Sequence, residues 1–334
     1  MATRVGINGF GRIGRSVFRI MAERGDVEVV AVNDLFDNAQ LAYLLKYDTV
    51  MGVLDREVTS DDDHLYVGGE EVAMTAERDP ASIPWGDMGV DVVIEATGVF
   101  RERAQIEKHL EAGARKVVLT VPSKDPIDAT IVLGVNDDDL KPEHRLVSNA
   151  SCTTNCLAPL AKILDDSFGL EEGLLTTIHA YTNDQRLADV PHKSIRRSRA
   201  AAENIVPTTT GAAKAVGKVL PHLDGKLDGM AMRVPVPDGS IVDFIVRLRE
   251  HPGVDEVNAA VRAAAEGPMA RIVEYSEVPL VSTDIIGNSH SSIFDALSTR
   301  AEGDGYVKVV SWYDNEWGYS NRVVDLVDRL AALR

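Results

Sequence analysis

The sequence predicts an α/β protein: a doubly wound parallel sheet in the first half, then an α+β domain with a mixed, mainly antiparallel sheet. Three observations support this prediction. A glycine turn at residues 9–14 joins an apolar strand to a helical pattern. Apolar strands and helical patterns then alternate to about residue 150. Beyond that point the strands alternate apolar and polar residues, with fewer helices between them, which is typical of antiparallel sheets.

Length and composition limit the class of protein. The 334 residues leave room for two domains, and an apolar content of 45% is that of an ordinary globular protein. No apolar run approaches the roughly 20 residues that a membrane span needs. The chain enters a strand near Arg4 without a charged and apolar leader, and two cysteines argue against a disulfide framework. We therefore expect a cytoplasmic protein without a membrane partner.

The net charge of −17 argues against nucleic acid as a partner, because a phosphate backbone demands a basic face. Acidic residues gather in expected turns and helix starts, as at 61–63 and 137–139. They are compatible with an ordinary solvated acidic surface. The alternative is a halophilic adaptation to concentrated salt, which is favoured by 52 acidic residues and only 11 lysines among 35 basic residues.

The first glycine turn predicts a dinucleotide site. Gly9, Gly11 and Gly14 follow a buried-looking strand and open a helix, so the main chain can approach a pyrophosphate that the helix N-terminus holds. The next strand ends at Asp34, 20 residues after Gly14, where a Rossmann fold uses an acid to bind the adenosine ribose hydroxyls. Because an acid there repels a 2′-phosphate, the pattern favours NAD over NADP.

The rest of the first 150 residues continues the alternation of helices and strands. The expected elements are a helix at 39–47, a hairpin within 57–74, a strand at 91–96, a helix at 102–112, and strands at 116–120, 129–133 and 145–147. The strand at 91–96 ends at Thr97 and Gly98, and cofactors lie at the carboxyl ends of strands in such sheets. Residues 1–150 are therefore predicted to form one NAD-binding domain.

Residues 151–156, Ser-Cys-Thr-Thr-Asn-Cys, place a thiol at the start of an expected helix. The unpaired N–H groups and the dipole of a helix N-terminus favour a thiolate, which makes Cys152 a candidate nucleophile. The residues alone leave open that Cys152 is a small buried side chain and that Ser151 or Thr153 only caps the helix. Cys156 lies one turn further on the apolar side and is predicted to pack; no metal site is expected from two cysteines alone.

The second half contains fewer helices. Strands are expected at 174–181, 227–234, 241–249 and 306–313, and helices at 254–265 and 317–333. Residues 182–207 form a long, polar, arginine-rich segment between the first two of these strands. Long loops of this kind are commonly functional or interfacial.

Four segments together resemble a known family: the glycine turn, the cysteine motif at 151–156, the strand end at 177–185 and the segment at 312–319. In this order and spacing they are similar to the phosphorylating glyceraldehyde-3-phosphate dehydrogenases over essentially the whole length. The resemblance implies a catalytic domain at 151–315 and a last helix, 316–334, that packs on the NAD-binding domain. It also implies a homotetramer, with the loop at 182–207 at subunit contacts.

The resemblance implies NAD-dependent oxidation of glyceraldehyde 3-phosphate, with inorganic phosphate, to 1,3-bisphosphoglycerate in glycolysis or gluconeogenesis. Cys152 would attack the aldehyde. His179 would take the hydroxyl proton as hydride leaves, giving a thioester that phosphate then cleaves. On the residues alone, a lone histidine near an apolar strand is more often a structural group.

The binding residues follow from the same resemblance. The substrate's own phosphate would contact Thr182 and Arg233, and the incoming phosphate would contact Ser151, Thr153, Arg197, Thr210 and Gly211. The cofactor would contact Gly9, Gly11, Arg12, Ile13, Gly14, Asp34, Arg78, Thr120 and Asn315. Without the resemblance, Arg197 could be a solvated charge and Thr210 a helix cap. An unpaired charge on Arg233 in an apolar strand would be costly, so a bound anion or carboxylate is expected there.

Three other functions are less consistent with these residues. Erythrose-4-phosphate dehydrogenase shares the cysteine motif and the glycine turn, but residues 179–185 and 209–211 are of the glyceraldehyde type. A non-phosphorylating aldehyde dehydrogenase would not need so many phosphate-type residues. An inactive homologue that senses redox state through Cys152 is disfavoured by the intact set of Cys152, His179, Arg197 and Arg233.

Overall fold

The computed structural model describes residues 2–25 and 27–333, which fold into two compact units. The first unit comprises Met1–Ile131, Asp138–Ala150 and Ser320–Arg334. The second comprises Val132–Asp137 and Ser151–Tyr319. Among the described residues, no helix is both long and apolar enough to cross a membrane.

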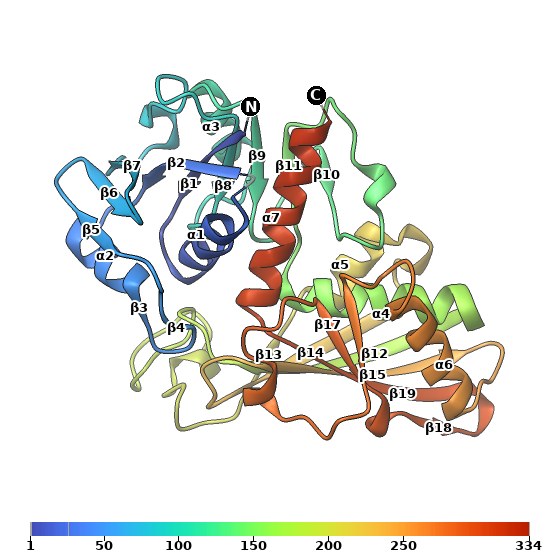
Figure 1. Cartoon of the computed structure of the whole chain (residues 1–334). Coiled ribbons are helices and arrows are strands. Elements are labelled where there is room, and N and C mark those ends of the chain that lie inside the picture. The colour runs from blue at the N-terminus through green and yellow to red at the C-terminus, as the bar shows by residue number, and fades with distance from the viewer. Residues whose placement is uncertain (1, 26, 334) are drawn as a thin grey trace. The chain divides into compact units, whose positions relative to one another are not determined.

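The first unit is built on a nine-stranded sheet in the order β10-β11-β9-β8-β1-β2-β7-β6-β5 (Figure 1). Every neighbouring pair from β10 to β7 is parallel, and only β6 runs antiparallel to its neighbours. Its strands are β1 (Thr3–Asn8), β2 (Val27–Asn33), β5 (Val58–Ser60), β6 (His64–Val67), β7 (Glu70–Thr75), β8 (Val92–Glu95), β9 (Lys116–Leu119), β10 (Ala129–Thr130) and β11 (Leu146–Ser148).

Helices connect and cover these parallel strands. They are α1 (Arg12–Arg24), α2 (Asn38–Lys46), α3 (Arg103–Glu111) and the end of α7 (Trp317–Ala332), with 3-10 turns η1 (Pro80–Ser82) and η2 (Asp137–Asp139) and a small ribbon of β3 (Tyr47–Asp48) and β4 (Gly52–Val53). The central strands are buried on both faces, as expected where helices cover a parallel sheet. In α7, Asp325 accepts a bond of 2.6 Å from Arg24 at the end of α1.

The strand order places the carboxyl ends of three strands side by side. β1 is flanked by β2 on one side and β8 on the other, and Asn8 is in register with both Asn33 and Glu95. In doubly wound sheets the crevice at such a switch in strand order is where dinucleotides bind. The predicted fold class is confirmed for this unit.

The second unit contains an eight-stranded mixed sheet, which confirms the predicted α+β character. Its order is β13-β14-β12-β15-β19-β17-β16, and β18 pairs with β19. Only β12 with β14 and β16 with β17 are parallel. The strands are β12 (Leu170–Ala180), β13 (Val206–Thr209), β14 (Leu227–Val234), β15 (Ser240–Leu248), β16 (Val273–Ser276), β17 (Ser292–Asp295), β18 (Arg300–Glu302) and β19 (Tyr306–Tyr313).

The helices of this unit are α4 (Cys152–Phe168), α5 (Ala212–Val219) and α6 (Val254–Ala265), with short 3-10 turns η3 (Arg196–Ser198), η4 (Pro221–Leu223), η5 (Ser282–Ile285), η6 (Ala296–Ser298) and η7 (Gly303–Gly305). One side of α4 packs against the sheet, and Cys156, Leu157 and Leu160 on it are completely buried. This packing holds the helix start, and with it Cys152, at the sheet.

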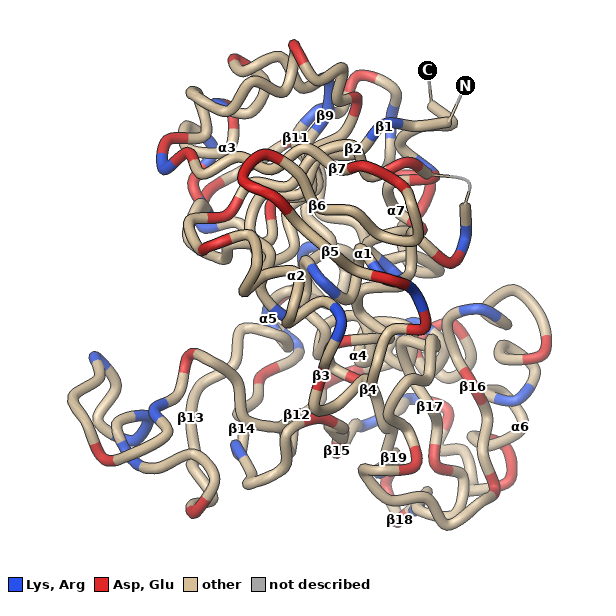
Figure 2. Tube along the Cα trace, turned by 60° about the vertical axis from the view of Figure 1, so that its left-hand side comes forward, with Lys and Arg blue, Asp and Glu red and all other residues tan. Residues whose placement is uncertain are grey.

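Some elements differ in extent or in number of strands from the sequence-based prediction. The strand expected at 129–133 is only Ala129–Thr130, and the hairpin expected within 57–74 is a three-stranded meander of β5, β6 and β7. The segment at 182–207 holds one 3-10 turn, an isolated bridge between Arg186 and Ala200, and the start of β13. Figure 2 shows basic residues gathered in this segment beside β13.

Candidate active site

Cys152 is the first residue of α4, and Ser151 is the N-cap. The Ser151 hydroxyl accepts a hydrogen bond of 3.1 Å from the main-chain N–H of Thr154. Ser151 therefore satisfies one of the unpaired N–H groups of the first turn, as expected of a serine cap. Ala150 has a φ of 53°, a left-handed conformation that turns the chain from β11 into the helix. The local sequence thus places the thiol at the helix N-terminus.

His179 lies near the end of β12, and its Nε2 is 3.5 Å from the Cys152 sulfur. Its Nδ1 lies 2.7 Å from the carbonyl oxygen of Ala180. With the proton on Nδ1, donated to the Ala180 oxygen, the Nε2 lone pair faces the sulfur. The arrangement can take a proton from the thiol, or from an oxygen bound beside it.

Arg233 completes this cluster from the neighbouring parallel strand, where it is in register with His179. Its Nη1 lies 3.0 Å from the Ala180 oxygen and 2.8 Å from Nδ1 of His179. The Ala180 carbonyl accepts from the guanidinium, whereas the contact with Nδ1 suits the tautomer in which that nitrogen carries the lone pair. The buried Nε of Arg233 has no hydrogen-bond partner among the described residues. Such a group gains from an anion that can accept its proton.

Burial sets the ionisation of the cysteine and the histidine. It raises the pKa of the Cys152 thiol, although the positive charge of Arg233 opposes that shift. Burial, and to a smaller extent the positive charge of Arg233, lower the pKa of His179 to about 3. The sequence-based expectation was a thiolate favoured by the helix dipole. Burial of Cys152 thus acts against the helix dipole and Arg233, and burial of His179 disfavours its charged form.

Tyr313 is a site residue that the sequence motifs did not single out. Its hydroxyl lies 2.9 Å from the hydroxyls of both Thr153 and Thr177, and its ring contacts His179 edge-on at 5.9 Å between centroids. The tyrosine therefore ties the first turn of α4 to the strand that carries the histidine. Its position at the end of β19, within the segment 312–319, was the only signal in the sequence.

Arg197, a predicted phosphate ligand, lies close enough to lower the pKa values of both His179 and Arg233 by its charge. It forms an ion pair with Asp184, and its Nε donates to the Thr208 hydroxyl at 3.0 Å. The alternative of a solvated loop charge is therefore not what the structure shows.

The other predicted phosphate ligands have local roles in the chain. Thr210 accepts a bond of 3.2 Å from the main-chain N–H of Ala212, and Gly211 is the N-cap of α5. Thr182 follows β12, and its carbonyl oxygen accepts a bond of 2.9 Å from the main-chain N–H of Gln185. Thr153 is buried, with its hydroxyl beside Tyr313.

A hollow of about 470 Å³ in the first unit lies at the carboxyl ends of β1, β2 and β8. Its lining includes the predicted cofactor residues Gly9, Gly11, Asp34 and Arg78, together with Thr97 at the expected strand end and with Asn8 and Asn33, which were not predicted. The Asp34 carboxylate accepts the main-chain N–H groups of Phe10 at 2.7 Å and Phe36 at 3.1 Å. These two bonds fix the acid beside the glycine turn, where a ribose can reach it.

Two positions of the turn require glycine, because other main-chain atoms lie too close for a Cβ atom. Gly9 has a φ of 92°, and a Cβ atom there would lie 2.7 Å from the main-chain nitrogen of Thr97. A Cβ atom on Gly14 would lie 2.2 Å from the carbonyl oxygen of Gly9. Any larger side chain at either position would push the turn away from the strand or the helix.

The remaining predicted cofactor residues are not among the residues that line this hollow. The Arg12 guanidinium pairs with Asp48 at 2.9 Å, so a contact with the cofactor would fall to main-chain atoms at the start of α1, which includes Ile13. Burial favours a higher pKa for Asp48, but Arg12 and main-chain N–H groups hold it at about 2. Thr120 donates to the carbonyl oxygen of Glu95 at 3.0 Å. In the second unit, Asn315 Oδ1 accepts a hydrogen bond of 2.6 Å from the Ser240 hydroxyl.

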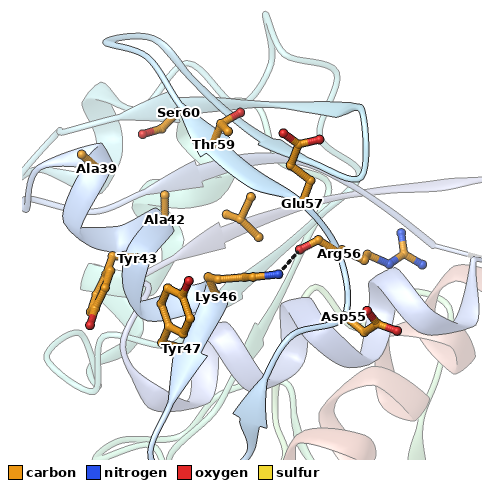
Figure 3. Close-up of a pocket in the computed structure, with 11 residues that line it drawn as sticks. Ala39, Ala42, Tyr43, Lys46, Tyr47, Asp55, Arg56, Glu57, Thr59 and Ser60 are labelled. Carbon is orange, nitrogen blue, oxygen red and sulfur yellow. Dashed lines mark hydrogen bonds between the residues drawn. The ribbon is translucent and has the colours of Figure 1, made fainter.

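A second, more open hollow of about 830 Å³ lies between α2 and β5 (Figure 3). Its lining includes Tyr43, Tyr47 and Lys46. Figure 3 shows the Lys46 ammonium directed at the main-chain oxygen of Arg56, at 2.7 Å, and it also donates to that of Leu54 at 2.8 Å. The lysine charge thus serves the local loop, and this hollow is distinct from the one beside Asp34.

Asp238 in the second unit supports a prediction about stability. Burial and the nearby carboxylates of Asp314 and Glu316 raise its pKa from 3.8 to about 9. Below its ordinary pKa this carboxyl is neutral in both the folded and the unfolded chain and does not destabilise the fold. As pH rises from about 4 towards about 9, only the unfolded chain ionises readily, so the free energy of unfolding falls. Asp238→Asn should therefore be more stable than the wild type near pH 8.5, by about 1–3 kcal/mol. Urea unfolding at pH 6 and 8.5 measures this; equal pH dependence in both proteins would contradict it.

Comparison with known proteins agrees over nearly the whole chain. The family model described as "Glyceraldehyde 3-phosphate dehydrogenase, NAD binding domain" matches residues 3–103. The model described as "Glyceraldehyde 3-phosphate dehydrogenase, C-terminal domain" matches residues 151–315. These matches span the glycine turn, the cysteine motif and His179.

Curated relatives extend the match to full length. The chain is 59% identical over 333 residues to a glyceraldehyde-3-phosphate dehydrogenase of Geobacillus stearothermophilus, covering 99% of each chain. It is 58% identical to glyceraldehyde-3-phosphate dehydrogenase 1 of Bacillus subtilis, also over 99% of each. It is 55% identical to the enzyme of that name in Mycolicibacterium smegmatis, over 98% of each. The chain therefore belongs to the glyceraldehyde-3-phosphate dehydrogenase family.

Proposed function

We propose that this protein is the NAD-dependent, phosphorylating glyceraldehyde-3-phosphate dehydrogenase of glycolysis, with Cys152 as nucleophile and His179 as base. The observation that supports these roles is the cluster in which the sulfur lies 3.5 Å from Nε2 of His179, beside Arg233. NAD, held in the hollow beside Asp34, supplies the hydride acceptor.

The proposed reaction starts from a neutral thiol and a neutral imidazole. The Cys152 sulfur bonds to the aldehyde carbon while its proton passes to Nε2 of His179, and Nε2 then gives that proton to the former carbonyl oxygen, which becomes the hemiacetal hydroxyl. His179 takes this proton back as the carbon loses hydride to NAD, which leaves a thioester. An oxygen of inorganic phosphate then attacks the acyl carbon, and the bond to sulfur breaks. The products are 1,3-bisphosphoglycerate, NADH and the regenerated cysteine.

Two positive groups would hold the two anions. Arg233, with the unpartnered Nε, suits the phosphate of the substrate, with Thr182 as a second ligand. Arg197 and the α5 start at Thr210 and Gly211 suit inorganic phosphate, together with Ser151 and Thr153 at the start of α4. Arginine forks and helix N-termini are the usual donors to phosphate oxygens.

Replacing Arg233 by leucine is expected to raise KM for glyceraldehyde 3-phosphate by about 10-fold to 100-fold, which corresponds to the loss of one charge-assisted bond. KM for NAD should change far less. Steady-state kinetics with each substrate varied in turn measures the two KM values separately. Arg247→Leu is the matched control, because Arg247 lies on β15 and is paired with Glu171 at 2.7 Å. Equal increases in both KM values for R233L would refute the placement.

The test of the proposed activity is NADH absorbance with and without inorganic phosphate, using glyceraldehyde 3-phosphate and erythrose 4-phosphate. We expect sustained turnover only with phosphate, and a higher kcat/KM for the three-carbon aldehyde. Sustained turnover without phosphate would instead indicate a non-phosphorylating enzyme. A preference for the four-carbon aldehyde would indicate erythrose-4-phosphate dehydrogenase.

Asp34 supports a preference for NAD over NADP, because its carboxylate faces the hollow where a 2′-phosphate would have to lie. The ratio of kcat/KM for the two cofactors tests this. A preference for NADP would show that Asp34 does not meet the adenosine ribose.

Three further properties belong to the same proposal. We infer a cytoplasmic homotetramer with residues 182–207 at subunit contacts, and an acidic surface adapted to concentrated salt. The two domains would divide near residue 150, with the helix from 316 packed on the first. Light scattering at working salt tests the assembly, and a monomeric mass would contradict it. Full activity and an intact fold in dilute buffer would remove the halophilic interpretation.

A further inference from the structure

A row of buried polar side chains crosses the carboxyl ends of β8, β1 and β2. Glu95, Asn8 and Asn33 are the last residues of these strands, and their exposures are 0%, 2% and 3%. Asn33 Nδ2 donates to Asn8 Oδ1 at 2.8 Å, and Asn8 Nδ2 donates to Glu95 Oε2 at 2.6 Å. We refer to these three residues as the strand-end network. Its function is not explained by the chemistry at Cys152.

One end of the strand-end network is fixed by main-chain groups. Asn33 Oδ1 accepts the main-chain N–H of Glu77 at 2.8 Å, and Asn33 Nδ2 donates to the Glu77 carbonyl at 2.9 Å. The Thr75 hydroxyl also donates to Oδ1, at 2.8 Å. Because an N–H can only donate and a carbonyl can only accept, the Asn33 amide has one orientation. It must present a donor to Asn8, which in turn must present a donor to Glu95.

The other end is fixed by a tryptophan. The indole Nε1 of Trp85 donates to Nδ1 of His109 at 3.0 Å, and both side chains are completely buried. An indole N–H only donates, so Nδ1 accepts and the imidazole proton is on Nε2. That Nε2 donates to Glu95 Oε2 at 3.0 Å. A second donor therefore converges on the same carboxylate oxygen.

Glu95 consequently faces donors only. Its other oxygen, Oε1, accepts the main-chain N–H of Thr97 at 2.9 Å and also the Thr97 hydroxyl. Position 95 therefore needs a group that accepts on both oxygens, and an ionised carboxylate is the side chain of this length that does so. A glutamine has the same size, but its NH₂ group would meet another donor whichever way it turned.

The strand-end network continues directly into the lining of the hollow. Asn8, Asn33 and Thr97 themselves line it. Asn8 precedes Gly9 of the glycine turn, and Asn33 precedes Asp34, the predicted ribose ligand. A shift of one residue of the network therefore moves the groups that would hold the dinucleotide. His109 and Trp85 lie behind the network, so their effect on the hollow passes through Glu95.

We propose that Glu95, held by His109 and Trp85, is a positioning residue for the dinucleotide site. It fixes the glycine turn, the ribose acid and the loop after β8 relative to one another. This proposal rests on the proposed function only in taking the hollow as the NAD site. It predicts that disturbing a buried residue behind the hollow weakens NAD binding selectively.

The test is a matched pair of substitutions at His109. Glutamine offers one amide donor for Glu95 and one acceptor for Trp85, whereas leucine, of comparable size, offers neither. We expect His109→Leu to raise KM for NAD by about tenfold or more, the effect of losing one bond to a charged group. His109→Gln should stay within about threefold of the wild type. KM for the aldehyde, measured at saturating NAD, should change less than twofold in both variants.

A second variant keeps the test informative if H109L does not fold. Glu95→Gln keeps the size of the side chain, and calorimetry with NAD should give an affinity about tenfold or more below that of the wild type. Unchanged NAD affinity in E95Q, or equal KM values for NAD in H109L and H109Q, would overturn the proposal while leaving the dehydrogenase function intact. If the wild-type protein itself bound no NAD, the proposed function would fail first.

Discussion

Cys152→Ser is expected to abolish turnover, with kcat falling by about 10⁴-fold or more, while NAD still binds. A serine hydroxyl at this position is a far poorer nucleophile than sulfur, and the neutral imidazole of His179 is a weak base for it. The NAD hollow is built from first-unit residues, so calorimetry should give a nearly unchanged affinity. The NADH assay measures the loss of turnover.

Cys156→Ser is the matched control, because the same change is made one helical turn away. The Cys156 sulfur is completely buried, lies 3.6 Å from the Ser292 hydroxyl, and has a pKa raised to about 12 by burial. This variant should keep kcat and lose only stability, by about 1 kcal/mol, for burying a hydroxyl in place of a thiol. Near-normal activity of C152S would remove Cys152 as the nucleophile.

His179→Asn is expected to lower kcat by about 10²-fold to 10⁴-fold, the usual contribution of a positioned general base. Asparagine can keep a bond to the Ala180 carbonyl, but it offers no titrating nitrogen to the sulfur. The rate at which iodoacetamide alkylates Cys152 should also fall, because proton transfer to Nε2 is lost. Steady-state kinetics and alkylation followed by mass spectrometry measure the two effects.

His222→Asn provides the comparison for this variant. His222 lies in η4 with its ring nitrogen 2.6 Å from Asp165, and more than half of its side chain is exposed. We expect H222N to leave kcat and the alkylation rate unchanged. If H179N retained most of the wild-type kcat, a different group would have to act as base.

The parts of the site predictable from sequence were those that depend on spacing along one segment. Asp34 lies a fixed distance after Gly14 because a helix and a strand separate them, and Ser151 caps α4 because a serine precedes an apolar helical pattern. The alternation of strands and helices likewise gave the two sheet types. Short strands such as β10 were overestimated, because two paired residues carry almost no periodic signal.

Features that depend on contacts between distant segments were not predictable. The register that sets His179 beside Arg233 comes from pairing of β12 with β14, and Arg12 meets Asp48 only in the folded chain. The sequence shows the helix start at Cys152 but not the burial that raises the pKa of its thiol. The strand-end network joins residues from separate elements, so no motif reveals it.

The most direct test of the central claim is to trap the acyl group on the enzyme. The protein is mixed with glyceraldehyde 3-phosphate and NAD without inorganic phosphate, quenched in acid and measured by intact mass spectrometry and peptide mapping. We predict one 3-phosphoglyceroyl group per chain, attached to Cys152 and discharged when phosphate is added before the quench. An adduct at another residue, or wild-type protein that turns over with phosphate yet never carries this group, would contradict the account.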